Sequence, residues 1–279
     1  MTTGKKRLDQ ILVDKGFISS RERAKRCIMA GMVYVDGEKV DKPGQKTPSD
    51  KNIYVKEDPL KYVSRGGLKL EKGLEAFKVD INDRIAIDVG ASTGGFTDCL
   101  LQVGARHVHA VDVGYGQFAW KLRKDDRVSV YERTNIRHVD SNLFEPIPTL
   151  ATVDVSFISL KLIIPKLVEI LDEPKEMIML IKPQFEVSRD KIGKNGVVKD
   201  RYTHIDVLQN ILEFSLENNL EPNNITYSPI KGPKGNIEYL IHLLDKKSNK
   251  NNYNRNRHFS DMIAREVKNA HEFLKGGSL

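Results

Sequence analysis

Residues 87–97 read IDVGASTGGFT, and this stretch decides the fold. An apolar run ends in Asp88, a glycine-rich turn follows, and a helical pattern begins near Phe96. A turn of this kind lets backbone amides and the amino-terminus of a helix approach a bound ligand closely. The glycines stand at positions 90, 94 and 95, which is not the G-x-G-x-x-G spacing of dinucleotide-binding turns. The stretch therefore predicts the first strand, turn and helix of an α/β domain that binds a ligand at the turn.

Short apolar segments alternate with helical patterns on the carboxyl-terminal side of this turn. Candidate strands cover 85–89, 107–113, 128–131, 151–155, 176–181, 225–230 and 238–244, and candidate helices cover 96–103, 117–124, 160–171, 202–219 and 260–274. Such alternation is typical of a doubly wound sheet with helices on both faces. We predict a Rossmann-like α/β domain with a seven-stranded, mostly parallel sheet.

Asp112 ends the second candidate strand, 22 residues after Gly90. Nucleotide-linked cofactors need a carboxylate at this place for their ribose hydroxyls. The glycine spacing favours S-adenosylmethionine over a cofactor with a pyrophosphate, because no diphosphate has to be cradled. A nicotinamide-dependent oxidoreductase is the alternative that this spacing disfavours.

The first 60 residues predict a separate, small α+β module. Two short helical patterns come first, and Ser19 or Ser20 can cap the second of them. Alternating valines then surround Asp36-Gly37, which is a strong hairpin signal. A short strand at 53–55 closes the module.

We therefore expect an amino-terminal domain over 1–60, a linker over 61–67 and a Rossmann-like domain over 68–279. Proline and glycine punctuate the junction between the two domains. The polar, basic segment 245–258 is expected to be a linker before a terminal helix.

The positive charge of the chain is concentrated in the amino-terminal module. Residues 1–62 hold 14 basic and 9 acidic side chains, whereas the remaining residues hold 31 and 29. A basic module beside a nearly neutral body is typical of a nucleic-acid-binding protein. A solvated basic surface is the alternative.

The chain has 279 residues, of which 39% are hydrophobic and 30% charged, as in globular proteins. No run approaches the roughly 18 apolar residues of a membrane helix, and the first ten residues lack the apolar core of a signal peptide. We therefore expect a cytoplasmic protein without a membrane segment. Cys27 and Cys99 lie in apolar segments without a C-x-x-C partner, so we expect packed side chains and no metal site.

Six motifs identify the chain as similar to a known family. They are DVGASTGGFT, DVGYGQ, ERTNIR, DVSFISL, IKPQFE and GNIEY, in this order along the sequence. They resemble the TlyA family of ribosomal RNA 2′-O-methyltransferases, whose catalytic domain is similar to that of the FtsJ type. The first 60 residues, with RLDQILVDKGF, SRERAKR and AGMVYVDG, resemble the small RNA-binding domain named after ribosomal protein S4.

The resemblance implies a catalytic tetrad of Lys69, Asp154, Lys182 and Glu238. Asp154 and Lys182 close apolar runs at the carboxyl ends of candidate strands, where open α/β sheets bind ligands. Glu238 begins a candidate strand, which we expect to be an antiparallel edge strand. A lysine that accepts the proton of a ribose hydroxyl must first be neutral. The alternative is two ordinary ion pairs at strand ends.

The resemblance also implies binding residues for S-adenosylmethionine and for RNA. The cofactor residues are Asp88, Gly90, Ser92, Gly94 and Phe96 in the first loop, Asp112 at the ribose, and Asn135 at the adenine edge, with helix capping as the alternative for Asn135. The expected phosphate contacts are Lys5, Arg7, Arg21, Arg23, Arg26 and Lys42. The expected partner is ribosomal RNA in a ribosomal subunit, with a cytidine of 23S RNA as the target and 16S RNA as a second candidate.

Three further features of the sequence lead to structural predictions. The long charged segment 183–200 is expected to order when RNA or cofactor binds. His107, His109 and His138 are expected to pack against strands, and Trp120 is expected in the core. Two other functions stay open: a non-catalytic RNA-binding or ribosome assembly factor, and a haemolysin-like protein that acts on membranes.

Overall fold

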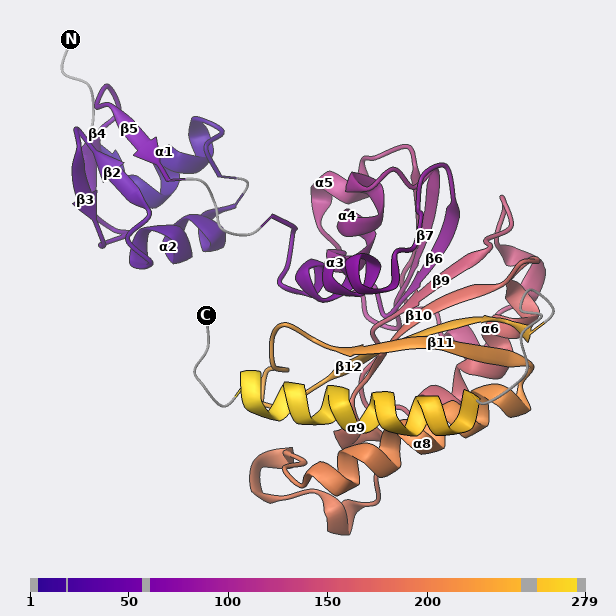
Figure 1. Cartoon of the computed structure of the whole chain (residues 1–279). Helices are drawn as coiled ribbons and strands as arrows, with labels where there is room; N and C mark the ends of the chain where they lie inside the picture. Colours follow the sequence, from indigo (N-terminus) through magenta and orange to yellow (C-terminus); the bar gives the residue numbers. More distant parts are fainter. Residues whose placement is uncertain (1–4, 19, 57–60, 247–254, 275–279) are drawn as a thin grey trace. The chain divides into compact units, whose positions relative to one another are not determined.

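The computed structural model describes residues 5–18, 20–56, 61–246 and 255–274, without the side chains of 255–258 (Figure 1). The chain divides into two compact units, Met1–Lys61 and Tyr62–Leu279. Gly66 and Gly67, which the sequence analysis assigns to the linker, form the first turn of a helix of the second unit. The expected linker at 245–258 lies largely outside the described residues.

Unit 1 has two helices and short strands around a small apolar core. Its elements are β1 (Lys5–Arg7), α1 (Leu8–Asp14), α2 (Arg21–Met29), β2 (Val33–Val35), β3 (Glu38–Val40), β4 (Lys46–Pro48) and β5 (Ile53–Val55). Ser20 caps α2 by accepting a hydrogen bond from the backbone N–H of Arg23. Asp36 and Gly37 both have positive φ, of 51° and 87°, and form the predicted hairpin turn. The predicted α+β character of this module is confirmed.

The elements of unit 2 alternate as the sequence predicts. They are α3 (Gly66–Phe77), β6 (Ile85–Val89), α4 (Gly95–Gln102), β7 (His107–Val111), α5 (Trp120–Arg123), β8 (Val128–Tyr131), η1 (Ile136–His138), η2 (Ser141–Leu143), β9 (Leu150–Val153), η3 (Leu160–Leu162), α6 (Ile164–Ile170), β10 (Glu176–Ile181), α7 (Pro183–Glu186), η4 (Arg189–Lys191), η5 (Lys194–Gly196), α8 (Arg201–Glu217), β11 (Leu220–Tyr227), β12 (Tyr239–Asp245) and α9 (Arg255–Phe273).

Seven strands of the described part of unit 2 form one sheet, in the order β11-β12-β10-β9-β6-β7-β8. Strands β6 to β10 pair in parallel, whereas β12 runs antiparallel to both of its neighbours. The antiparallel direction predicted for the strand after Glu238 is therefore confirmed. Its predicted place at the edge is wrong, because β11 covers the outer side of β12.

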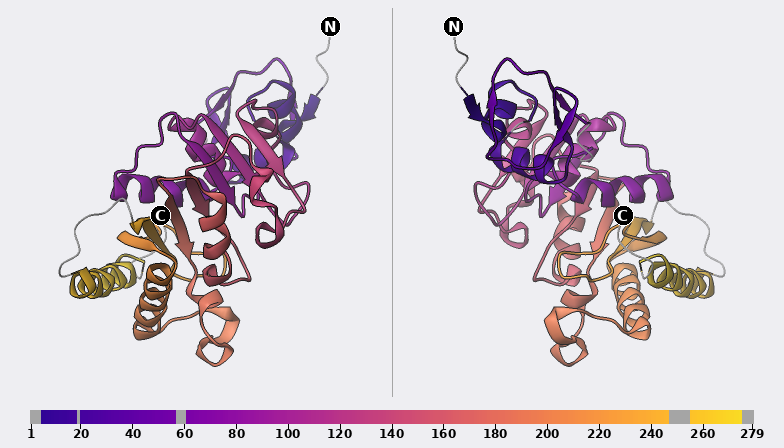
Figure 2. Two further views of the ribbon diagram at one scale, coloured as in Figure 1. Left: turned by 90° about the vertical axis from the view of Figure 1, so that its right-hand side faces the viewer. Right: turned by 90° about the vertical axis from the view of Figure 1, so that its left-hand side faces the viewer.

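Helices cover both faces of this sheet, as the views in Figure 1 and Figure 2 show. Helices α3, α4 and α5 pack on one face in one apolar cluster, and α6, α8 and α9 pack on the other in a second cluster. The predicted mostly parallel, Rossmann-like sheet is confirmed. The carboxyl ends of β6, β7, β9 and β10 meet at one edge, which is where such sheets bind ligands.

The packing predictions were partly correct. Cys27 and Cys99 are buried as expected, and His109 is buried within the sheet. Trp120 is 66% exposed at the start of the four-residue helix α5, so its predicted place in the core is wrong. Leu122 is the residue of this short helix that is buried, and Trp120 does not share its side of the helix. His138 is exposed in η1 instead of packing on a strand.

The described residues contain neither a membrane-spanning helix nor a metal-binding cluster. No helix there is long and apolar enough to cross a membrane. Within the same part of the chain, no three His, Cys, Asp or Glu side chains are arranged to hold a metal ion.

Candidate active site

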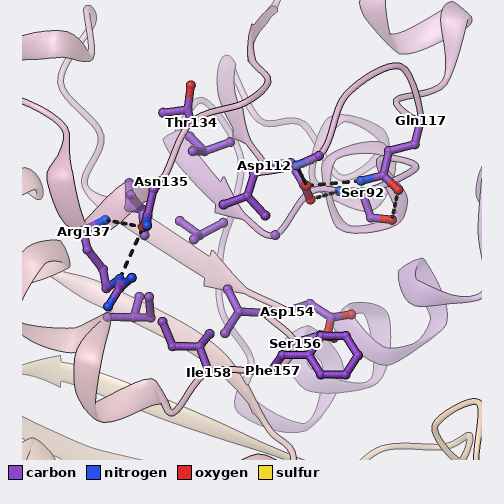
Figure 3. A pocket seen from close by; sticks show the side chains of 18 residues that line it. Ser92, Asp112, Gln117, Thr134, Asn135, Arg137, Asp154, Ser156, Phe157 and Ile158 are labelled. Atoms are coloured by element: carbon purple, nitrogen blue, oxygen red, sulfur yellow. Dashed lines mark hydrogen bonds between the residues drawn. The ribbon is translucent and has the colours of Figure 1, made fainter.

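A cavity of about 500 Å³ lies at the carboxyl ends of β6, β7 and β9 (Figure 3). Loops after these three strands carry Gly90, Ser92, Asp112 and Asp154 into its walls, and the loop after β8 adds Asn135. Apolar side chains, among them those of 136, 158 and 163, line the rest of it. Four of the seven predicted cofactor residues thus face this cavity.

Asp112 organises the polar end of the cavity. Its carboxylate accepts hydrogen bonds from the backbone N–H groups of Ser92 (2.7 Å) and Gly114 (2.6 Å). The Gln117 side chain donates a third hydrogen bond of 3.1 Å, and Figure 3 shows these groups converging. The carboxylate is therefore fixed in orientation while it still borders the cavity, as a ribose-binding acid requires.

Gly90 has a φ of +84°, which favours glycine. A Cβ atom at this position would lie 2.5 Å from the backbone oxygen of Asp154. The first loop can therefore approach the β9 loop only because residue 90 has no side chain. Ser92, with a φ of +49°, continues this tight turn along the cavity wall.

Asp88, Gly94 and Phe96 are not among the residues that line the cavity. The Asp88 carboxylate is fully buried and accepts hydrogen bonds from the hydroxyls of Thr97 (2.6 Å) and Thr152 (3.2 Å). Burial raises the pKa of Asp88 to about 7. These three residues thus belong to the packing between the turn and α4 and form no part of the cavity wall.

Asn135 has the capping role that was left open for it. Its side-chain oxygen accepts a hydrogen bond from the backbone N–H of Arg137 at 3.2 Å, at the start of η1. The same residue borders the cavity (Figure 3). The cap fixes the side chain at the cavity wall, so capping and cofactor contact are compatible.

A second cavity of about 360 Å³ adjoins the first. The two share Ser156 and Phe157, and the second is also lined by Lys182 and Glu238. Phe157 is 89% exposed and has a φ of +64°, which is unusual for a bulky residue. The sequence analysis did not name Ser156 or Phe157 as site residues, although both belong to the quoted motif DVSFISL.

The four residues of the predicted tetrad lie in one chain of ion pairs. Lys69 Nζ lies 2.6 Å from Glu238 Oε2 and 3.8 Å from Asp154 Oδ2. Lys182 Nζ lies 2.6 Å from Asp154 Oδ1 and 2.9 Å from Ser156 Oγ. Two cations and two carboxylates thus balance in a site that leaves Lys69, Lys182 and Glu238 each less than a tenth exposed.

Within this cluster the two lysines have different surroundings. Lys182 borders the second cavity, whereas Lys69 borders neither cavity and lies between two carboxylates. Asp154 joins them and also borders the first cavity. A molecule in the second cavity would therefore meet Lys182 and not Lys69.

The predicted RNA contacts of unit 1 divide into two kinds. The guanidinium of Arg7 pairs with both oxygens of the buried Asp9, and Arg21 pairs with one of them at 3.2 Å. These hydrogen bonds, that from Arg7 foremost, hold the pKa of Asp9 below its usual value. Arg7 and Arg21 are thereby oriented while each stays about half exposed. Lys5, Arg26 and Lys42 are exposed, and Arg23 is half-buried.

The first cavity fits S-adenosylmethionine in the chemistry of its walls. A carboxylate at one end suits ribose hydroxyls, apolar side chains suit a flat adenine, and the carboxylate of Asp154 suits a positive sulfonium.

Comparison with known families defines the class of protein. Residues 62–244 match the FtsJ-like methyltransferase family, and residues 6–48 match the S4 domain. The fold and the site are therefore those of an FtsJ-like methyltransferase that carries an S4 domain, and its cofactor is S-adenosylmethionine.

Individual relatives narrow the class. The chain is 52% identical over 244 residues to the "Putative rRNA methyltransferase YqxC" of Bacillus subtilis, with 87% of each chain covered. It is 40% identical to the "16S/23S rRNA (cytidine-2'-O)-methyltransferase TlyA" of Mycobacterium tuberculosis, with 85% of this chain and 89% of that protein covered. Among solved structures, the "Putative hemolysin from Streptococcus thermophilus" has a TM-score of 0.74 at 43% identity, over 98% of each chain. The chain belongs to the TlyA family.

Proposed function

We propose that this protein transfers a methyl group from S-adenosylmethionine to the ribose 2′-hydroxyl of a cytidine in ribosomal RNA. The observation that carries the proposal is the junction of the two cavities. Asp154 lines the first cavity, Lys182 lines the second, and their side chains form an ion pair of 2.6 Å. 23S RNA is the first candidate substrate and 16S RNA the second, since the Mycobacterium tuberculosis relative is named for both.

Lys182 is the group that meets the ribose hydroxyl in this proposal. Its ammonium has two neighbours at hydrogen-bond distance, Asp154 Oδ1 and Ser156 Oγ, which leaves its third hydrogen-bonding direction for the cavity. In its neutral form the amine accepts the hydroxyl proton as the oxygen forms its new bond to carbon. Asp154 and Ser156 fix the direction of that lone pair.

Lys69 and Glu238 do not contact the reacting oxygen in this proposal and act through Asp154. The 2.6 Å pair between them fixes Lys69, which in turn lies beside Asp154. When Lys182 is neutral, Lys69 is the cation of the cluster that remains beside both carboxylates, so one negative charge is left uncompensated and not two. Buried charges left without partners cost several kcal/mol, which makes this compensation necessary.

The cofactor, when bound, supplies a methyl group on a positive sulfonium. In this proposal Asp112 binds the ribose, Asn135 borders the adenine, and Gly90 and Ser92 form the near wall. Asp88, Gly94 and Phe96 support that wall from behind. Much of the rate then comes from holding hydroxyl, methyl carbon and sulfur in line.

Unit 1 binds the RNA through phosphates. Arg7 and Arg21, oriented by Asp9, would contact the RNA backbone together with four further cations of the same unit, the exposed Lys5, Arg26 and Lys42 and the half-buried Arg23. Phosphate contacts position a nucleic acid without specifying sequence. Binding should therefore weaken steeply with salt concentration, and a flat salt response would contradict this role.

The proposed location is the cytoplasm, where ribosomal RNA is made in bacteria. The haemolysin-like alternative draws on the name of the Streptococcus thermophilus relative. Lysis of red cells by the purified protein, unchanged in Lys182→Ala, would support it. A non-catalytic RNA-binding role would show as tight RNA binding without methyl transfer.

The test is transfer of labelled methyl from S-adenosylmethionine to ribosomal subunits from a strain that lacks the modification. Small subunits, large subunits and naked RNA are assayed separately, each with wild type and with Lys182→Ala. We expect incorporation into large subunits that disappears in the variant. No incorporation on any substrate by the wild type would overturn the proposal.

A further inference from the structure

A buried histidine links the segment that forms part of the second cavity to the first residue of β12, which directly follows Glu238. His204 on α8 is completely buried. One ring nitrogen, Nε2, lies 3.0 Å from the backbone oxygen of Val198, and the other, Nδ1, lies 2.8 Å from the hydroxyl of Tyr239. Tyr239 is the first residue of β12 and directly follows Glu238.

The partners determine the protonation state of this ring. A backbone carbonyl only accepts hydrogen bonds, so Nε2 of His204 must carry a proton and donate it. Burial lowers the pKa of His204 to about 4, so the ring is neutral at pH 7 and Nδ1 is an acceptor. The Tyr239 hydroxyl can then donate to Nδ1, and Nε2 of His271 on α9, at 3.2 Å from the same atom, is a second candidate donor for its single lone pair. The bond from Nε2 to the Val198 oxygen therefore has one possible direction, and Tyr239 at 2.8 Å is the nearer partner of Nδ1.

The segment that His204 holds forms part of the second cavity. Phe185, Ile192 and Gly196, all within 183–200, line that cavity beside Lys182. Between 184 and 200 only Val198 is buried, so this segment has little apolar packing of its own. Polar contacts must therefore fix it.

Those polar contacts lie at the two ends of the segment. At the amino-terminal end, the Glu186 carboxylate accepts hydrogen bonds from Ser159 and from the backbone N–H of Leu160, at 2.6 and 2.8 Å. At the carboxyl-terminal end, Asn236 accepts a hydrogen bond from the Val198 N–H at 3.0 Å and donates to the Gly196 oxygen at 2.9 Å. His204 adds the bond to the Val198 oxygen.

We propose that His204 is a positioning residue for methyl transfer, which fixes the 183–200 segment against Tyr239 and so shapes the second cavity around Lys182 and Glu238. This inference rests on the proposed function for its kinetic readout. The His204 side chain lines neither the first cavity nor the second. Its loss should therefore reduce turnover on RNA and leave cofactor binding intact.

The test compares His204→Leu and Tyr239→Phe with the matched control Ser215→Ala. Ser215 is also buried on α8, but its hydroxyl donates only to the Ile211 oxygen within the helix. Tyr239→Phe removes a single hydroxyl and keeps the ring, so it serves if His204→Leu does not fold. Three quantities are measured: methyl transfer to ribosomal subunits, affinity for S-adenosylmethionine, and the rate at which trypsin cuts after the exposed basic residues at 189, 191 and 194.

We expect His204→Leu to lower kcat by about tenfold and to speed tryptic cleavage by a similar factor, as the loss of one or two buried hydrogen bonds implies. Tyr239→Phe should give a smaller change of the same kind, and Ser215→Ala should give neither. Affinity for S-adenosylmethionine should stay within about twofold in all three variants.

Unchanged cleavage and turnover in a folded His204→Leu, or an equal loss of cofactor affinity, would overturn the inference. If the wild type transfers no methyl group, the proposed function fails, while the cleavage result still tests the anchoring.

Discussion

Replacing Lys182 by Met tests the charge cluster most sharply. The substitution keeps a long side chain and removes one cation from a set of two cations and two carboxylates. Asp154, whose side chain is 20% exposed, keeps only Lys69 at 3.8 Å. Breaking a buried ion pair costs about 3–5 kcal/mol and a surface pair about 0–1 kcal/mol. The partial exposure of Asp154 therefore places the expected loss of stability at about 1–3 kcal/mol.

Activity should fall much more than stability in this variant. A general base contributes about 10²–10⁴-fold to rate, which corresponds to roughly 3–5 kcal/mol of transition-state free energy. Denaturant unfolding gives the stability, calorimetry gives the affinity for S-adenosylmethionine, and single-turnover methyl transfer gives the rate. We expect cofactor affinity within a few-fold of wild type, because Lys182 does not line the first cavity.

Lys121→Met is the matched control for Lys182→Met. Lys121 Nζ also pairs with a buried aspartate, Asp98, at 3.0 Å, but it lies outside both cavities. Its own side chain is 55% exposed, so its loss should cost less than about 1 kcal/mol and leave turnover within twofold. Equal activity of Lys182→Met and Lys121→Met would refute the assignment of Lys182 as the reacting group.

Three further changes probe the first cavity. Gly90→Ala should lower the unfolding free energy by about 2–4 kcal/mol, seen in denaturant melts, because its Cβ meets the Asp154 oxygen at a positive φ; an unchanged midpoint would contradict this. Asp112→Asn should weaken S-adenosylmethionine binding by about 10–100-fold in calorimetry, since an amide cannot accept from all three donors; unaltered affinity would remove Asp112 from the site. Asp88 binds its proton more tightly when folded, with a pKa of about 7 against an ordinary 3.8, so wild-type stability should fall as pH rises from 4 to 7 and then level off. Asp88→Asn should lack this decline, which can reach about 1.4 kcal/mol per pH unit, and parallel pH profiles for the two proteins would show that Asp88 ionises normally.

The sheet was predictable because its strands carry strong periodic signals. The run 177–181 is continuously apolar, as expected for a strand buried on both faces, and it forms most of β10, an interior strand of the sheet. The place of β12 inside the sheet was not predictable. Strand direction followed from Glu238 at its start, but which strand covers the edge depends on the pairing of β11, and no local pattern encodes that pairing.

Helix α3 is the opposite case, because two glycines at its start led to the wrong prediction of a linker. Gly66 and Gly67 suggest a linker in sequence, yet they open a twelve-residue helix. Gly67 is required by close packing, since a Cβ there would overlap the ring of Tyr62. Such contacts between a helix and a preceding segment appear only in three dimensions.

The charged residues of the site could be predicted from the sequence, whereas the uncharged residues that hold them in place could not. The tetrad came from resemblance, and the structure brings its four members together as ion pairs. Ser156, which holds Lys182, and His204, which anchors the cavity wall, have no spacing or charge signal. Ser156 bonds to Lys182 and His204 to Tyr239, both far away along the chain, so only the fold reveals them.

The most direct test of the central claim is the chemical position of the transferred methyl group. Labelled ribosomal RNA from the transfer assay is hydrolysed with alkali, which cleaves beside a free 2′-hydroxyl and spares a methylated one. The account predicts label in alkali-resistant dinucleotides that yield 2′-O-methylcytidine on further digestion. Label recovered in mononucleotides, with the methyl group on a base, would contradict it.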